Sequence, residues 1–197
     1  LGRLQGAYYH FWVDMILQYN FFNQHDAVGE WLSDYVQQRN AFVLGLTGAR
    51  GMMVKSSGSV NPVYDAGYYN YRLRRGEIDR FLVGFYGRLA FGMSRYVYVS
   101  SEGQPFVGYN TQKGGLVGAA YSFPNAASNA DTLLMLRNAL VYEDLKDNVE
   151  TGDLVLLRGC PRAWFQNGKR IGAAGLSTYF GDISLSVDSK LREHFRG

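Results

Sequence analysis

The segment 95–103, RYVYVSSEG, carries the acidic side chain with the clearest potential for chemistry, Glu102. Its four residues from Tyr96 onward are aromatic or β-branched in unbroken succession, a pattern that favours an extended backbone. Serine, glycine and proline surround Glu102, so we expect a turn that ends a short strand. Because loops often carry catalytic groups, we predict that Glu102 faces a substrate and transfers a proton. The alternative is a solvated glutamate in a turn.

Asp65 is the second candidate acid. It stands near the start of the segment 64–75, YDAGYYNYRLRR, which we predict to be a short aromatic helix ended by Gly76. The alternative for Asp65 is structural, because aspartate is one of the preferred residues for capping the N-terminus of a helix.

Aromatic and amide side chains could form the walls of a binding site. A flat ring can stack against the apolar face of a ligand, and amides can hydrogen-bond to hydroxyl groups. The candidate substrate-binding residues are Trp12, Tyr68, Tyr69, Tyr109 and Tyr121 for stacking, Gln104 and Asn110 for hydrogen bonding, and His10. Most tyrosines in a helical protein serve packing, and a lone His10 beside Tyr8 and Tyr9 can be a hydrogen-bonded core residue or a proton-abstracting group.

Composition excludes several classes of function. The net charge of +3 is mild for 197 residues, and the densest basic cluster is the group of three arginines at 72, 74 and 75, so we expect no nucleic-acid partner. The three histidines, at 10, 25 and 194, have no metal-ligand spacing, and Cys160 is alone, so no metal is expected. No phosphate-binding loop motif occurs, and we expect no cofactor. No apolar stretch is long enough to span a membrane, so no membrane partner is expected.

Helical periodicity dominates the first 150 residues. Apolar residues recur at spacings of three and four over 2–23, on most sides of the helix, which is typical of a helix surrounded by protein. We predict a second, amphipathic helix capped by Asp26, a third over 64–75, a fourth over 77–94 and a fifth from a capping box at Ser128 to about Asp147. Two long irregular segments, 48–62 and 104–127, separate them.

The last quarter of the chain changes to the period of a strand. Leu154–Leu157 is a short apolar run, Asn167-Gly168 is a hairpin signal, and apolar residues alternate with polar ones over 183–188. Two or three strands do not close a sandwich, so we expect this sheet to need further strands.

This order of elements resembles the end of an (α/α)6 toroid followed by a β-sandwich, as in bacterial glycoside hydrolases and some polysaccharide lyases. The resemblance is carried by YDAGYYNYRLRRGEIDRFLVGFYGRLAFGMSRYVYVSSEG and by LVLLRGCPRAWFQNGKRIGAAGLSTYFGDISLSV. It implies a mainly α fold, with inner and outer helices of a partial toroid over 1–150 and the start of a β-sandwich over 151–197. A self-contained α+β domain is the alternative fold.

The resemblance implies carbohydrate chemistry. Glycoside hydrolysis uses two carboxyl groups, and Glu102 and Asp65 are the candidates, with Glu102 matching the base that comes from a late loop. The implied partners are a poly- or oligosaccharide and the rest of the same polypeptide, without which we expect the piece to be inactive. A toroidal polysaccharide lyase using His10 with Tyr8 or Tyr9, and a non-catalytic glycan-binding domain, are the alternatives. The compartment stays open, and periplasmic or secreted is favoured for a bacterial protein.

Overall fold

The structure is a computed structural model, and it describes the chain in nine segments. These are residues 9–18, 21–39, 42, 44–47, 59–105, 108–110, 115–117, 122–146 and 149–190.

Five α-helices lie in the first three quarters of the described chain. They are α1 (Tyr9–Gln18), α2 (Ala27–Arg39), α3 (Ala66–Arg74), α4 (Ile78–Phe91) and α5 (Ala126–Leu140). Each overlaps a helix predicted from periodicity, so the presence of all five is confirmed. A short 3-10 helix, η1 (Arg162–Phe165), follows later in the chain.

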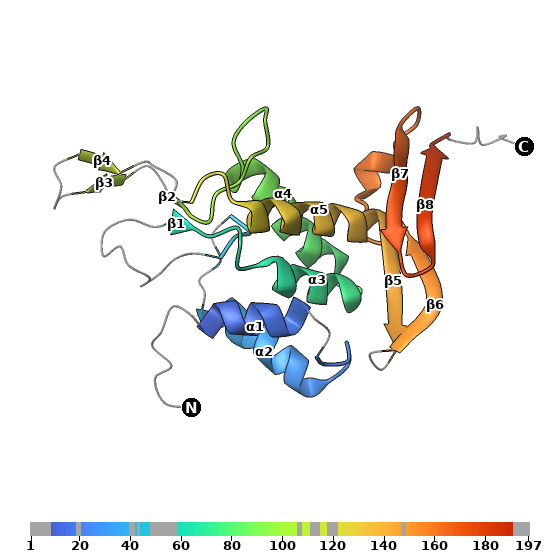
Figure 1. Ribbon diagram of the computed structural model, residues 1–197, viewed down its shortest axis with the longest axis horizontal. Coiled ribbons are helices and arrows are strands. Elements are labelled where there is room, and N and C mark those ends of the chain that lie inside the picture. The colour runs from blue at the N-terminus through green and yellow to red at the C-terminus, as the bar shows by residue number, and fades with distance from the viewer. Residues whose placement is uncertain are drawn as a thin grey trace, which may run out of the picture.

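Helix α3 is the centre of the helical part. All nine of its residues are buried, and α1, α4 and α5 pack against it while α2 packs on α1 (Figure 1). Its consecutive aromatic residues explain this position, because Tyr68, Tyr69 and Tyr71 give it apolar surface on several sides. Gly76 has a φ of 80°, a left-handed conformation that glycine adopts without strain, and it lies between α3 and α4.

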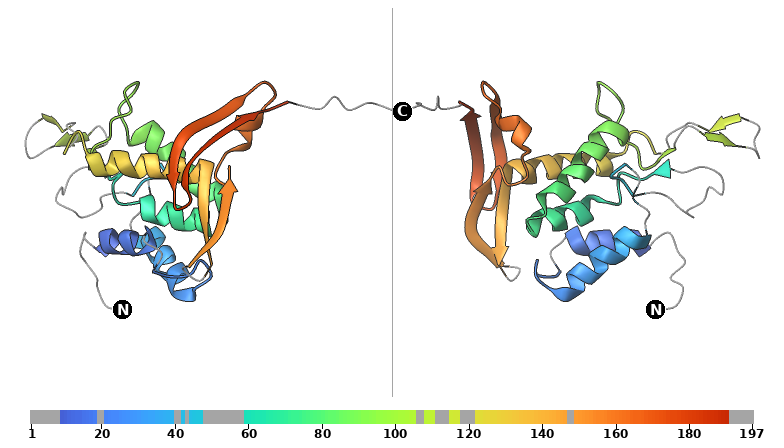
Figure 2. Two further views of the ribbon diagram at one scale, coloured as in Figure 1. Left: turned by 45° about the vertical axis from the view of Figure 1, so that its right-hand side comes forward. Right: turned by 180° about the vertical axis from the view of Figure 1, so that it is seen from behind.

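The described strands form four antiparallel pairs. They are β1 (Ser59–Val60) with β2 (Gln104–Pro105), β3 (Gly108–Asn110) with β4 (Gly115–Val117), β5 (Val141–Lys146) with β6 (Val149–Leu156), and β7 (Arg170–Thr178) with β8 (Gly181–Asp188). The last two pairs stand together on one side of the helices, whereas the first two lie toward the opposite end (Figures 1 and 2).

Two apolar cores hold these parts together. The first lies among the helices and includes Tyr69, Phe81 and Met135. The second lies where the end of α5 meets the strands, with Val141 and Ile171 among its buried members. Alternate residues of β8 turn toward this second core, as the apolar–polar alternation over 183–188 predicted.

The predicted fold class, a mainly α partial (α/α)6 toroid followed by a short β-sheet segment, is wrong. The described residues combine five helices with four two-stranded sheets, and the helices gather around α3 instead of forming successive inner and outer pairs. The physical reason is that periodicity identifies which face of a helix is buried but not which helix covers it. The arrangement is α+β, which was the alternative.

Three local predictions also need correction. Residues 95–99 form a turn instead of a strand, with Tyr96 and Tyr98 at φ values of 71° and 50°. Helix α5 is capped by Asn125, whose side chain accepts a hydrogen bond from the Ser128 amide at 2.8 Å, and it ends at Leu140 where β5 begins. The turn of the β7–β8 hairpin is at 179–180, whereas Asn167-Gly168 joins η1 to β7.

The expected domain boundary at residue 150 falls within the β5–β6 hairpin, and the division into two domains stays a prediction. Among the described helices, none has the length and apolar character that crossing a membrane requires.

Candidate functional site

Glu102 lies at the end of the helical part where β1 pairs with β2. The register of this pair places Val60 opposite Gln104, which brings the residues after β1 beside those before β2. As a result, the Tyr64 hydroxyl donates a hydrogen bond of 2.7 Å to Oε1 of Glu102. The Glu102 side chain is half-buried. The carboxylate is therefore both oriented by protein and within reach of solvent.

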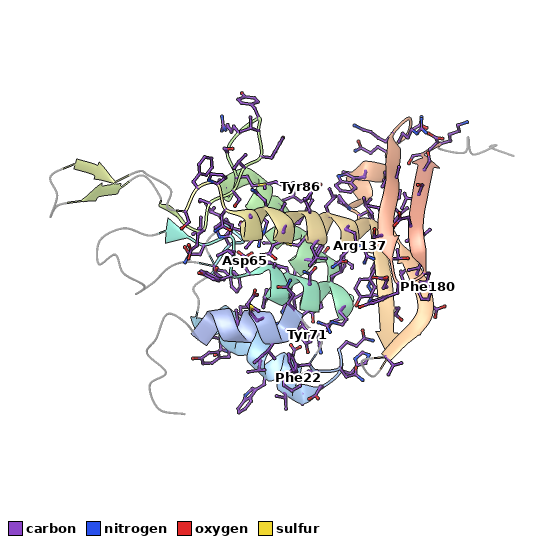
Figure 3. The ribbon with its side chains drawn as sticks, viewed as in Figure 1. Phe22, Asp65, Tyr71, Tyr86, Arg137 and Phe180 are labelled. Carbon is purple, nitrogen blue, oxygen red and sulfur yellow. The ribbon has the colours of Figure 1, made fainter. Side chains whose placement is uncertain are left out.

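Asp65, the second candidate acid, is fully buried at the same end of the helices (Figure 3). It occupies the N-cap position of α3, but its side chain makes no capping hydrogen bond. It forms an ion pair with Arg88 of α4, itself fully buried, and accepts a hydrogen bond from the Thr47 amide at 3.2 Å. This geometry gives Asp65 a role in joining α3, α4 and the segment before β1.

Asp14 of α1 supplies the cap that Asp65 does not. Its Oδ1 accepts a hydrogen bond of 2.9 Å from the amide of Tyr68, one of the N–H groups in the first turn of α3 that have no partner within the helix. Burial raises the pKa of Asp14 to about 8, although the amides of Tyr68 and Gly67 oppose the shift and nearby Asp65 adds to it. Asp14 is therefore mostly protonated at neutral pH.

A third acid, the half-buried Asp131 of α5, adjoins the buried Asp14, Asp65 and Arg88, and we call these four residues the buried acid cluster. Burial raises the pKa of Asp65 to about 6 against the opposing effect of the Arg88 guanidinium, and burial also raises the pKa of Asp131. Three ionised carboxylates beside one guanidinium would leave an uncompensated negative charge in the protein interior, which is costly. The raised pKa values are consistent with that cost.

Arg88 also connects the cluster to the segment that carries Glu102. Its Nη1 donates to the carbonyl oxygen of Ser128 at 3.2 Å, and the Ser128 hydroxyl lies 2.6 Å from the Ser100 hydroxyl. Asn129 in turn accepts a hydrogen bond from the Ser100 amide at 2.9 Å. The turn that bears Glu102 is thus fixed to α4 and α5 by a polar network.

Two of the predicted substrate-binding aromatics lie in the core. Tyr68 and Tyr69 are each 3% exposed, and both rings contact Phe42, with centroids 4.8 and 5.7 Å away. The Tyr68 hydroxyl donates to Gln37 at 3.1 Å, and the Tyr69 hydroxyl donates to the Gly45 carbonyl oxygen at 2.5 Å. Both side chains are covered by protein and bind its own polar groups.

The other predicted site residues are described by their backbone or not at all. His10 and Trp12 belong to α1, Gln104 to β2, and Tyr109 and Asn110 to β3, but their side chains lie outside the described part of the structure, as does the whole of Tyr121. The structure therefore places Tyr64 in contact with Glu102. Asp65 is buried, so it does not share the solvent-accessible surface that Glu102 reaches.

Sequence reasoning missed the buried acid cluster and the aromatic loop beside it. Asp14 and Arg88 are charged residues inside strongly apolar helical segments, and that signal could have indicated a buried ion pair. Tyr96 and Tyr98, predicted to lie in a strand, are 90% and 60% exposed on the turn after α4. Their left-handed backbone has no signal in the sequence, because it follows from tertiary context.

Among the described residues, no group of three or more histidine, cysteine, aspartate or glutamate side chains is arranged to hold a metal ion. Comparison of the chain with protein-family models, with curated proteins and with solved structures gave no match.

Proposed function

We propose that this chain belongs to a carbohydrate-active enzyme, a glycoside hydrolase, in which Glu102 acts as the base or acid/base. The observation that supports the proposal is the half-buried Glu102 carboxylate held at 2.7 Å by the Tyr64 hydroxyl. A carboxylate used in proton transfer must be held in one orientation and must be reachable by substrate. Glu102 has both properties, and Asp65 has only the first.

An exposed aromatic side chain on a segment joined to the Glu102 segment supports a sugar as the ligand. The segment that carries Glu102 is joined to the start of α5 by a hydrogen bond of 2.9 Å from the Asn125 amide to the Ser100 carbonyl oxygen. Phe123, two residues before Asn125, is 53% exposed. An exposed flat ring on a segment that is hydrogen-bonded to the one carrying Glu102 offers a surface on which a sugar ring can stack.

The test is glycan hydrolysis by the full-length protein and by its Glu102→Gln variant, because the present chain alone is expected to be inactive. We expect release of reducing ends from at least one member of a panel of polysaccharides, and a loss of at least about a hundredfold in rate for Glu102→Gln with unchanged folding. Asp153→Asn, which neutralises an exposed carboxylate on β6, is the matched control and should keep full activity. Undiminished hydrolysis by Glu102→Gln would remove this residue from the mechanism.

A second candidate function is glycan binding without cleavage. It is favoured by the burial of Asp65, because hydrolysis ordinarily needs two carboxyl groups that flank the scissile bond. Retardation of the protein in glycan-containing gels without any release of product would support this function. Release of an unsaturated product with ultraviolet absorbance would contradict both candidates and indicate a lyase.

A further inference from the structure

Two adjoining hollows lie along α5, and the first of them lies between α5 and α4. The first, of ≈ 410 Å³, is almost wholly apolar, and the second, of ≈ 400 Å³, lies between the end of α5, η1 and the start of β7. Leu136 and Trp164 line both, so the hollows adjoin. The loop after α4 and the η1 segment rise at either end of this stretch of α5 (Figure 1). We call the two hollows together the α4–α5 groove.

The apolar end of the groove is open to solvent. Leu133 is 66% exposed and Tyr98 is 60% exposed, and both line the first hollow with Leu89 and the buried Met93. Trp164 is held in place there, because its indole N–H donates a hydrogen bond of 3.0 Å to the Tyr86 hydroxyl. Covering such a concave apolar surface is favourable, and a surface of this kind is typical of a binding site.

The other end of the groove is positively charged. Lys169 and Arg170 both line the second hollow. Arg170 has Asp188 at 3.7 Å, but both side chains are largely exposed, so this ion pair neutralises little. No acidic group of the described residues forms an ion pair with Lys169. The groove therefore presents apolar surface at one end and two cations at the other.

We propose that the α4–α5 groove docks an amphipathic helix, with the apolar face of that helix in the first hollow and an acidic end at Lys169 and Arg170. A surface formed by two neighbouring helices offers ridges and grooves into which the side chains of a third helix fit. Acidic side chains in the last turn of the docked helix, and the negative end of its dipole, complement the two cations.

The test is binding of a synthetic helical peptide to the full chain, followed by fluorescence anisotropy. The peptide has about 15 residues, enough for measurable helix formation, with leucines at helical spacing on one face and glutamates in the last turn. A matched peptide carries lysines in place of these glutamates. We expect the acidic peptide to bind at least about fivefold more tightly than the basic one, as two rim charges would give.

Variants of the chain show whether this binding is at the groove. Leu133→Asp should abolish binding, whereas Val149→Asp, at an equally exposed valine on β6, should not change it. The double variant Lys169→Glu with Arg170→Glu should reverse the preference between the two peptides. Because these side chains are exposed, circular dichroism should report unchanged folding.

Three results would overturn the proposal. The first is equal binding of both peptides, and the second is binding that Leu133→Asp leaves intact. The third is self-association of the chain in analytical ultracentrifugation that Leu133→Asp abolishes, since that would identify a second copy as the occupant.

Discussion

Arg88 joins the buried acid cluster to the start of α5. It is fully buried, it pairs with Asp65, and it contacts the Ser128 carbonyl oxygen at the start of α5. Removing one partner of a buried ion pair leaves the other charge without compensation, which typically costs 3–5 kcal/mol. We therefore expect Arg88→Met to lower the free energy of unfolding by about 3–5 kcal/mol in urea denaturation.

The controls for this prediction come from the same helix and the same pair. Arg80→Met removes an arginine of α4 that is half-exposed and pairs with Glu77 one turn away, and should cost less than about 1 kcal/mol. The double variant, Asp65→Asn with Arg88→Met, lacks both charges. Its free energy of unfolding should be higher than that of Arg88→Met alone. Equal stability of the single and double variants would contradict the role of Asp65 as the partner.

The sequence predicted some properties of individual residues and not others. Glu102 was expected in a turn that follows a short strand, and the structure has a bend at Glu102 but no strand over 96–99. The burial of Asp65 was not predictable, since it depends on Arg88 reaching it from another helix. Tyr68 and Tyr69 lie in the core. Because tyrosine occurs both in cores and on sugar-binding surfaces, residue type alone did not distinguish these two locations.

At the scale of elements, the N-terminus of α3 is completed by a side chain from α1. The Asp14 side chain accepts a hydrogen bond from the Tyr68 amide, and the two helices approach so closely at Gly67 that a Cβ there would clash with the Asp14 carbonyl oxygen. This contact explains why α3 begins where it does, although its own N-cap residue makes no capping bond. Docking of α1 on α3 therefore involves the protonation state of Asp14.

The chain should become less stable as the pH rises. The pKa of Asp14 is raised from 3.8 to about 8 on folding, so the folded state holds a proton that the unfolded state has lost between these pH values. The stabilising effect of this bound proton is complete below about pH 4 and is lost as the pH approaches and passes 8. Asp65, with a pKa raised to about 6, acts in the same direction at lower pH, and the raised pKa of Asp131 also has this sign.

Asp14→Asn tests this dependence, because asparagine resembles protonated aspartate and can still accept the Tyr68 amide. We measure the free energy of unfolding by urea denaturation at mildly acidic and at mildly alkaline pH. We expect it to fall less between these two conditions for Asp14→Asn than for the unmodified chain. The difference should be on the order of 1–3 kcal/mol, since one pKa unit corresponds to about 1.4 kcal/mol. Asp153→Asn, at an exposed site, should retain the original pH dependence; a retained dependence in Asp14→Asn would contradict the assignment.

Element boundaries show where local sequence stops being sufficient. Periodicity located all five helices, but the end of α5 is set by pairing of β5 with β6, a contact between segments that periodicity does not describe. The run 96–99 has strand propensity and forms an exposed turn instead, with Met93 paired to Ser100 across it. A segment with strand propensity forms a strand only where a neighbouring strand can pair with its backbone groups. None of the described strands lies beside this run.

At the scale of the whole molecule, the helical core and the strand core adjoin at a small number of residues. Leu136 and Trp164 pack against both cores, and Gly159 lies directly on Ala139 and Phe81. The toroid expected from sequence would have placed the helices and strands in separate domains. The observed contacts instead favour folding of the two parts as one cooperative unit.

Gly159→Ala tests this coupling, because a Cβ at position 159 would lie 2.9 Å from both the Ala139 Cα and a Phe81 ring carbon. Overpacking of this kind costs about 1–3 kcal/mol, and in a single cooperative unit it should lower the urea midpoints of both parts equally. Circular dichroism reports the helices, and labelling of the single cysteine, Cys160, reports the strand core in which it is buried.

Gly172→Ala, on β7 where a Cβ meets nothing closer than 3.8 Å, is the matched control and should change both midpoints little. Separate midpoints for the two probes in the unmodified chain would contradict cooperative folding and support two domains divided near residue 150.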